Sequence, residues 1–225
     1  EIFVWSQTKH SNLHPLLGYR SLPRPQLISP WCRHGNLTVY LQANPDLSRC
    51  DKLRLIFQIA CGLEYLHSRN PPICHADVKP ENVLINDWHG AALSDFGLSR
   101  FLQDLGAHSG FTTSETVKGS VRYMASELFN GQKPDLQSDV FAFGGLILTV
   151  MSGKAPFDGI LYQGILGRVM QDRPPRWRDH PNLPAEDTLW KLMRRCWAKN
   201  PAARPTIREV LLEVSERENP LQCTS

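Results

Sequence analysis

One stretch of the sequence, residues 74–100, constrains the fold of this chain more than any other. It reads C-H-A-D-V-K-P-E-N-V-L-I-N-D-W-H-G-A-A-L-S-D-F-G-L-S-R. A polar loop opens the stretch, a short apolar run with the character of a strand follows, and a further acidic residue comes after a polar turn. Four side chains in this order can carry chemistry: Asp77, Lys79, Asn82 and Asp95.

These four side chains suit phosphoryl transfer from a magnesium-bound nucleotide to a hydroxyl group. The carboxylate of Asp77 can accept or orient the hydroxyl proton, and the ammonium group of Lys79 can stabilise the migrating negative charge. Asn82 and Asp95 supply the hard oxygen ligands that Mg²⁺ prefers. A polar loop beside a hairpin, without a catalytic role, is the alternative interpretation.

The string His-x-Asp-x-Lys-x-x-Asn, followed by Asp-Phe-Gly, resembles the catalytic loop and the metal-binding triplet of the protein kinases. The resemblance extends from Glu1 to about Glu216, and the strings L-G-Y, G-L-E-Y-L-H and R-Y-M-A are closest to the tyrosine-kinase-like serine/threonine branch. It implies that Asp77 and Lys79 are catalytic and that ATP and Mg²⁺ are the cofactors. It also implies that His75 braces the catalytic loop.

The fold that this resemblance implies is α+β, with a mostly helical large lobe and a truncated small lobe. Residues 1–29 would be the remnant of the small lobe, one helix and two strands, and residues 30–225 would be the hinge and the large lobe. Apolar periodicity and turn residues predict the individual elements. Helices are predicted at 51–69, 138–152, 162–171, 186–198 and 207–216, and strands at 13–19 and 26–30.

Residues near the start of the chain resemble the parts of a kinase that hold the nucleotide. Glu1 takes the place of the glutamate that pairs with a strand lysine, although a surface glutamate at a helix end is the alternative. Ser29 would guard the back of the adenine pocket, and the backbone near Trp31 and Cys32 would bind the adenine. Because Pro30 has no N–H group, the donated hydrogen bond is expected from Cys32. An apolar strand that runs into a turn is the alternative interpretation.

The polar segment at residues 97–119 resembles a kinase activation segment. It carries several hydroxyl groups, on Ser109, Thr112, Thr113, Ser114 and Thr116. The family closes this segment with Ala-Pro-Glu, whereas residues 125–127 read Ala-Ser-Glu, and Glu127 is expected to form a buried ion pair with Arg204. Ala76 replaces the arginine that binds phosphate on this segment in the family. Activity is therefore expected to depend weakly on its phosphorylation.

Two further features follow from the resemblance. Asp139, near the start of the apolar helix predicted at 138–152, is expected to bond the backbone of the catalytic loop, and it could also cap that helix.

Lys79 lies two residues after Asp77, and a small hydroxyl residue, Ser120, precedes the string V-R-Y. This pattern is similar to that of kinases that phosphorylate serine and threonine. The expected substrates are therefore proteins with such hydroxyls.

No glycine-rich phosphate loop and no strand lysine precede Glu1 in this sequence. We therefore expect the chain to be a fragment of a complete kinase domain and to transfer phosphate poorly on its own. A catalytically silent kinase-like module that acts by binding partners is the alternative hypothesis. The retained metal-ligand and catalytic side chains favour the enzyme, because a scaffold has no physical need of them.

Composition excludes several other classes of function. The net charge of +3 is too small to indicate binding to nucleic acid or to an anionic membrane surface. The long apolar run at residues 140–151 is shorter than the roughly 20 residues that span a bilayer. The 6 cysteines are scattered and include no Cys-x-x-Cys pair. This spacing argues against a zinc site or a disulfide framework and predicts a reducing, intracellular, cytoplasmic location.

Overall fold

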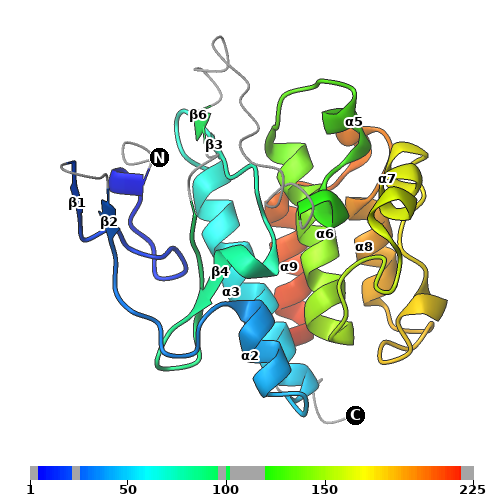
Figure 1. Ribbon diagram of the computed structural model, residues 1–225, viewed down its shortest axis with the longest axis horizontal. Coiled ribbons are helices and arrows are strands. Elements are labelled where there is room, and N and C mark those ends of the chain that lie inside the picture. Colours follow the sequence, from blue (N-terminus) through cyan, green and yellow to red (C-terminus); the bar gives the residue numbers. More distant parts are fainter. Residues whose placement is uncertain (1–4, 22–25, 96–99, 102–119, 219–225) are drawn as a thin grey trace.

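The computed structural model in Figure 1 describes residues 5–21, 26–95, 100–101 and 120–218. Helices make up most of the described chain, and short antiparallel strand pairs lie beside them. The segment with β1 (Gly18–Arg20) and β2 (Gln26–Ile28) lies at one side of the helical body in this view. The arrangement confirms the expected α+β fold with a mostly helical large lobe.

Four helices build the centre of the large lobe: α3 (Arg49–His67), α6 (Leu136–Ser152), α8 (Leu189–Cys196) and α9 (Ile207–Glu218). Helix α3 packs against α6 and α9, and α6 packs against α8. Aliphatic side chains such as Leu63, Leu146 and Val210 are completely buried between them. Three shorter helices lie around this group: α2 (Leu37–Ala43), α5 (Ser126–Phe129) and α7 (Tyr162–Met170).

Helix α6 is buried on nearly every side, as its uniformly apolar sequence predicts. The carboxylate of Asp135 accepts a hydrogen bond from the Ser138 N–H at 2.8 Å, and the Ser138 hydroxyl oxygen accepts one from the Asp135 N–H at 3.0 Å. This reciprocal capping box starts the helix two residues earlier than predicted. The expectation that Asp139 could cap α6 is therefore wrong, because Asp135 occupies that position.

Most other helix predictions are correct to within a few residues. Helix α9 starts at the predicted capping box, in which Glu209 accepts from the Thr206 N–H at 2.7 Å and donates its own N–H to the Thr206 hydroxyl at 3.2 Å. Helix α8 is shorter than the predicted 186–198, since the Asp187 carboxylate binds the Leu189 N–H at 2.9 Å and helical hydrogen bonding begins only there.

The strand pairs bring the two ends of the 74–100 stretch together. Strand β3 (Ile73–Cys74) pairs with β6 (Arg100–Phe101), and β4 (Val83–Ile85) pairs with β5 (Ala91–Leu93). Val83 lies opposite Leu93, so the residues just before β4 and just after β5 are neighbours. The strand predicted at 13–19 is wrong in its extent, because Leu13 forms a single parallel bridge to Leu93 and only the last residues reach β1.

The N-terminal segment packs directly on α3. The buried indole of Trp5 donates from Nε1 to the His14 carbonyl at 2.5 Å, and the His10 ring stacks on Tyr65 at a centroid distance of 5.1 Å. Gly62 of α3 faces this segment, and a Cβ atom at Gly62 would lie only 2.4 Å from the Asn12 carbonyl oxygen. Glycine is therefore required here for the close approach of the two backbones.

The cysteines differ in one respect from expectation. Cys50, in the first turn of α3, is disulfide-bonded, whereas Cys32, Cys61, Cys74 and Cys196 are free. Spacing along a sequence reveals only local cysteine pairs, so this bond could not be foreseen from the scattered positions. Within the described ranges, no helix is both long and apolar enough to cross a membrane.

Candidate active site

The loop at residues 75–82 connects β3 to β4 and carries the predicted catalytic residues. Its backbone is held by Asp139 of α6, whose two carboxylate oxygens accept hydrogen bonds from the His75 and Ala76 N–H groups at 2.8 Å each. These bonds fix Ala76 at φ 68°, a left-handed conformation that is costly for a residue with a Cβ atom. The predicted role of Asp139 in bonding the loop backbone is confirmed.

Asp139 is fully buried, yet the pKa of its carboxyl group is lowered. Burial raises the pKa of its carboxyl group, but hydrogen bonds and charge from His67 and His75 outweigh burial, and the net pKa lies below the ordinary value. His67, at the end of α3, places Nε2 at 3.0 Å from the same carboxylate. The anion is therefore stabilised by donors from two directions, which keeps it an acceptor for the loop.

His75 is completely buried and braces the loop from inside, as predicted. Its Nε2 lies 3.1 Å from the Ser94 carbonyl oxygen, and its Nδ1 accepts from the Asp77 N–H at 3.3 Å. The ring thereby connects the catalytic loop to the residue that precedes Asp95.

Asp77, Lys79 and Ser120 form a closed triangle of hydrogen bonds. The Lys79 ammonium donates to Asp77 Oδ2 at 2.6 Å and to the Ser120 hydroxyl at 2.9 Å, and that hydroxyl donates to Asp77 Oδ1 at 2.9 Å. The Asp77 and Lys79 side chains are only 10% and 8% exposed. The two charges are thus held in a fixed geometry, with little water to screen them.

Asn82 belongs to the same cluster. Its Nδ2 group donates to both the backbone oxygen and Oδ2 of Asp77, at 2.9 Å each, so its amide oxygen faces away from Asp77. The backbone oxygen of Asn82 accepts a hydrogen bond from the Ser94 N–H at 2.8 Å. Asp95, which follows Ser94 and is exposed, is therefore held near Asn82. An amide oxygen and a carboxylate are hard ligands of the kind that Mg²⁺ takes, so these two residues fit the predicted metal site.

The predicted adenine-binding residues lie apart from this cluster. Ser29 follows β2 and is half-buried, whereas Trp31 is 85% exposed. Cys32 is half-buried, with its sulfur 3.9 Å from His14 Nδ1, and burial and the charge of Asp87 raise the pKa of its thiol. Their binding of adenine stays a prediction.

Several predictions lie outside the described residues. Glu1, the proposed partner of a strand lysine, is one of them. The activation-segment hydroxyls are the others: Ser109, Thr112, Thr113, Ser114 and Thr116.

Sequence reasoning missed two histidines that support the site. His67 supports Asp139 from α3, and its position at the C-terminal end of that helix gave no sign of this contact in the sequence. His14 is 4% exposed, and its backbone N–H donates to the Leu93 carbonyl at 2.7 Å. Burial lowers the pKa of its imidazole ring. His14 lies in the strand predicted at 13–19, and the sequence of a strand does not show whether a histidine in it is buried.

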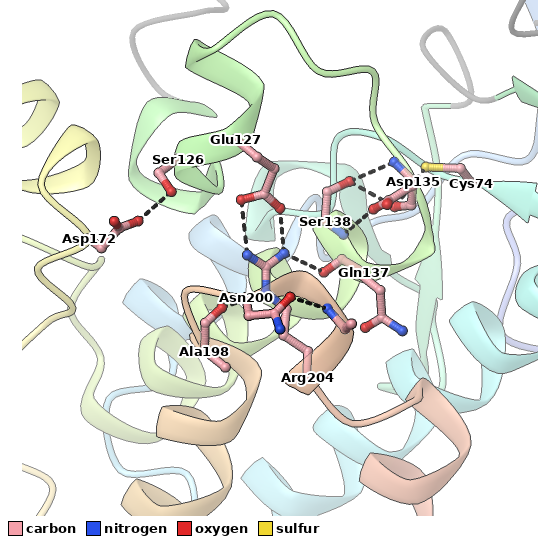
Figure 2. Close-up of polar contacts among 11 residues, drawn as sticks. Cys74, Ser126, Glu127, Asp135, Gln137, Ser138, Asp172, Ala198, Asn200 and Arg204 are labelled. Carbon is pink, nitrogen blue, oxygen red and sulfur yellow. Dashed lines mark hydrogen bonds and ion pairs between the residues drawn. The ribbon is translucent and has the colours of Figure 1, made fainter.

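The predicted buried ion pair of Glu127 and Arg204 is confirmed. Figure 2 shows the two side chains facing each other, with bonds of 2.5 and 3.0 Å from the guanidinium group to the two carboxylate oxygens. The remaining guanidinium donors reach the carbonyls of Ala198 at 2.9 Å and Gln137 at 3.1 Å. Arg204 therefore ties α5, which follows Ser120 in the chain, to α6 and to the segment before α9.

Comparisons with known proteins agree with this arrangement. The family model described as protein tyrosine and serine/threonine kinase matches residues 1–214. The chain is 34% identical over 208 residues to human receptor-interacting serine/threonine-protein kinase 3. The aligned region covers 86% of this chain and 38% of that protein. It is 32% identical over 217 residues to the Arabidopsis thaliana serine/threonine-protein kinase ATG1c, with coverage of 93% and 28%.

The chain therefore spans less than half of the length of each of these two relatives. The family match, in contrast, covers nearly the whole chain and includes every residue of the Asp77 cluster. The helical lobe, the braced loop and the buried Glu127–Arg204 pair agree with the same family. This chain belongs to the protein tyrosine and serine/threonine kinases.

Proposed function

We propose that this protein transfers the γ-phosphoryl group of ATP to serine or threonine hydroxyls of protein substrates. The observation that carries the proposal is the set of donors around Asp77. A carboxylate offers about four acceptor positions. Lys79, Asn82 and Ser120 occupy three of them. Among the described residues no other side chain donates to this carboxylate, so one position is left for the hydroxyl of a substrate.

The chemistry follows from that remaining position. A substrate hydroxyl that donates to Asp77 has its oxygen oriented for attack on the γ-phosphorus, and Asp77 can take up the proton as the new bond forms. The Lys79 ammonium lies 2.6 Å from the same carboxylate and can stabilise negative charge on the transferred group. Because the loop backbone is held by Asp139, both groups are positioned before the substrate arrives.

Asn82 and Asp95 would hold Mg²⁺, which would neutralise charge on the phosphates when bound. Their own contribution is positional. The Asn82 amide is oriented by Asp77, and the Ser94 N–H holds the backbone of Asn82 at 2.8 Å, so the two ligand residues move together.

The choice of serine and threonine rests on Lys79 and Ser120. Both groups lie against Asp77 and reduce the space beside it, which suits a short aliphatic hydroxyl more than the long phenol of tyrosine. The relatives named above are called serine/threonine-protein kinases, which supports the same choice.

The test is phosphotransfer by the full-length natural protein and by two aspartate variants. Asp77→Asn should lower kcat by at least about 100-fold, the usual contribution of a general base, while ATP affinity changes little. Asp46→Asn is the matched control, because Asp46 is an exposed residue of the loop between α2 and α3. Asp95→Asn should weaken magnesium-dependent nucleotide binding as well as turnover.

Phosphoamino-acid analysis of the products tests the acceptor. Phosphoserine and phosphothreonine are expected, and phosphotyrosine as the main product would contradict the assignment. Normal turnover by Asp77→Asn would contradict the catalytic role. Magnesium–ATP binding without any turnover in the natural protein would favour the silent binding module instead.

A further inference from the structure

A single 3₁₀ turn at Val121–Tyr123 begins directly after Ser120, and one arginine attaches this turn to the loop at residues 153–158 that follows α6. We propose that Arg122 is a positioning residue for phosphotransfer, because it fixes the turn and thereby the Ser120 hydroxyl that binds Asp77. The inference rests on the proposed function, since the role that it assigns concerns the same carboxylate.

Arg122 holds the loop after α6 by its main-chain oxygens. Its Nη1 atom donates to the carbonyl oxygen of Pro156 at 2.8 Å and to that of Phe157 at 2.7 Å. Hydrogen bonds from a charged donor are about twice as strong as neutral ones. Two segments that are 34 and 35 positions apart in the chain are therefore joined firmly at this point.

The backbone that accepts these bonds is strained. Phe157 has a φ of 59°, a left-handed conformation that is unfavourable for a bulky side chain. Such a conformation persists only where its surroundings hold it. Phe157 is 4% exposed and belongs to an apolar cluster with Val121, Ile165 and Val169. Apolar packing and the guanidinium group therefore hold the turn and the loop together as one unit.

Ser120 connects the position of this unit to the catalytic carboxylate. Its hydroxyl accepts from the Lys79 ammonium at 2.9 Å and donates to Asp77 Oδ1 at 2.9 Å. The place of this hydroxyl decides which acceptor position of Asp77 is left for a substrate. A shift of the turn would move Ser120 and disturb the orientation of the substrate hydroxyl, although the loop of Asp77 is still held by Asp139.

Both hydrogen bonds come from one nitrogen atom, which allows a matched pair of variants. A lysine ammonium carries three donors, so Arg122→Lys can make both bonds. Methionine keeps an unbranched side chain but has no donor, so Arg122→Met loses both. Arg176→Met is the control, because Arg176 is exposed and pairs with Asp179 in the loop after α7.

Phosphotransfer by the full-length natural protein is measured with a peptide that this protein phosphorylates on a serine/threonine peptide array. Arg122→Met should lower kcat about 10–100-fold, whereas Arg122→Lys should keep most of it and Arg176→Met all of it. The KM for ATP should change by less than about twofold. The reason is that Asn82, a predicted magnesium ligand, is oriented by bonds to Asp77 that do not involve Ser120.

A double-mutant cycle tests whether Arg122 acts through Ser120. Ser120→Ala alone should lower kcat, because it removes the hydroxyl that binds Asp77. Adding Arg122→Met to Ser120→Ala should lower kcat by less than about twofold further, since nothing is left for Arg122 to position. A merely structural Arg122 would instead lower kcat by the same factor in both backgrounds.

Hydrogen exchange measures the attachment without activity. The Met124 and Asp158 N–H groups are bonded within the turn and the loop, to Val121 and Ala155. Peptides that cover residues 120–124 and 154–158 should exchange faster in Arg122→Met than in Arg122→Lys.

Four outcomes in an active natural protein would overturn the role of Arg122: equal exchange in the two variants, normal kcat in Arg122→Met, equal loss in Arg122→Lys, or additive effects in the cycle. These outcomes would leave the proposed function intact. Absence of turnover by the natural protein would overturn the proposed function, and this role with it.

Discussion

Replacing Asp139 by asparagine should destabilise the protein far more than the same change at Asp135, although both residues lie at the start of α6. Asp139 is 1% exposed and accepts hydrogen bonds from His75, Ala76 and His67 at 2.8, 2.8 and 3.0 Å. Asparagine keeps one acceptor oxygen and turns an NH₂ group toward a donor. At least one charge-assisted bond is then lost, and one buried N–H group is left without an acceptor.

The magnitude follows from these two losses. A hydrogen bond to a charged group contributes about 1.5–3 kcal/mol, and a buried unsatisfied N–H costs about 1–3 kcal/mol. The free energy of unfolding should therefore fall by about 3–5 kcal/mol in Asp139→Asn, as for other buried charges that lose their partners. Asp135→Asn should change it by less than about 0.5 kcal/mol, because asparagine and aspartate are equally good N-caps.

Urea unfolding followed by circular dichroism measures both values, and the m-value should stay constant so that the midpoints can be compared. Phosphotransfer should also fall in Asp139→Asn, since Ala76 at φ 68° loses the bonds that fix it and Asp77 is no longer positioned. A difference of less than about 1 kcal/mol between the two variants would refute the argument that this carboxylate holds the catalytic loop.

Three further predictions concern the same framework. The natural protein should be more stable than Asp139→Asn, and this difference in the free energy of unfolding should be complete above the ordinary carboxyl pKa of about 3.9. It should disappear as the pH falls through the lowered pKa of Asp139 in the folded protein. Urea unfolding at a series of pH values between about 2 and 6 measures it. Arg204→Ala should cost about 3–5 kcal/mol in the same assay, against less than about 1 kcal/mol for Arg195→Ala, whose ion pair is exposed. Gly62→Ala should lower the thermal midpoint because its Cβ meets backbone at 2.4 Å, whereas Gly167→Ala, with open space around it, should raise the midpoint; equal shifts would contradict the packing.

The catalytic loop could be predicted because its residues are close in sequence. Asp77, Lys79 and Asn82 stand within six positions, so any fold that forms the loop brings them near one another. The Glu127–Arg204 pair is different, since 77 positions separate its members. No local pattern connects them, and only the resemblance to a family made that prediction.

The features that sequence could not supply depend on contacts between distant elements. His67 ends an amphipathic helix, and nothing in that pattern places its ring against Asp139, 72 positions later. The cap of α6 by Asp135 is different, because Ser138 is only three positions later and this reciprocal pair is a local pattern that the prediction overlooked. Trp31 is 85% exposed, whereas a tryptophan in a sequence is more often expected to be largely buried.

Ser126 marks the place where this sequence departs from the Ala-Pro-Glu of the family, and the backbone there is nevertheless suited to proline. Ser126 is the first residue of α5, a position that favours proline, and Ala125 before it is extended at ψ 150°, as a residue before proline must be. The serine instead donates a hydrogen bond to the Asp172 carboxylate, which also binds Lys199 at 3.0 Å.

The two side chains therefore stabilise this position in different ways. Ser126→Ala loses a hydrogen bond to a charged group, at a cost of about 1.5 kcal/mol or more, and gains nothing in return. Ser126→Pro loses the same bond, but its ring restricts the unfolded chain and returns about 0.4–1 kcal/mol. The thermal unfolding midpoint should be highest for the natural protein, lower for Ser126→Pro and lowest for Ser126→Ala. Ser126→Pro as the least stable of the three would show that the ring clashes at α5, and that the departure from the family motif reflects a changed backbone.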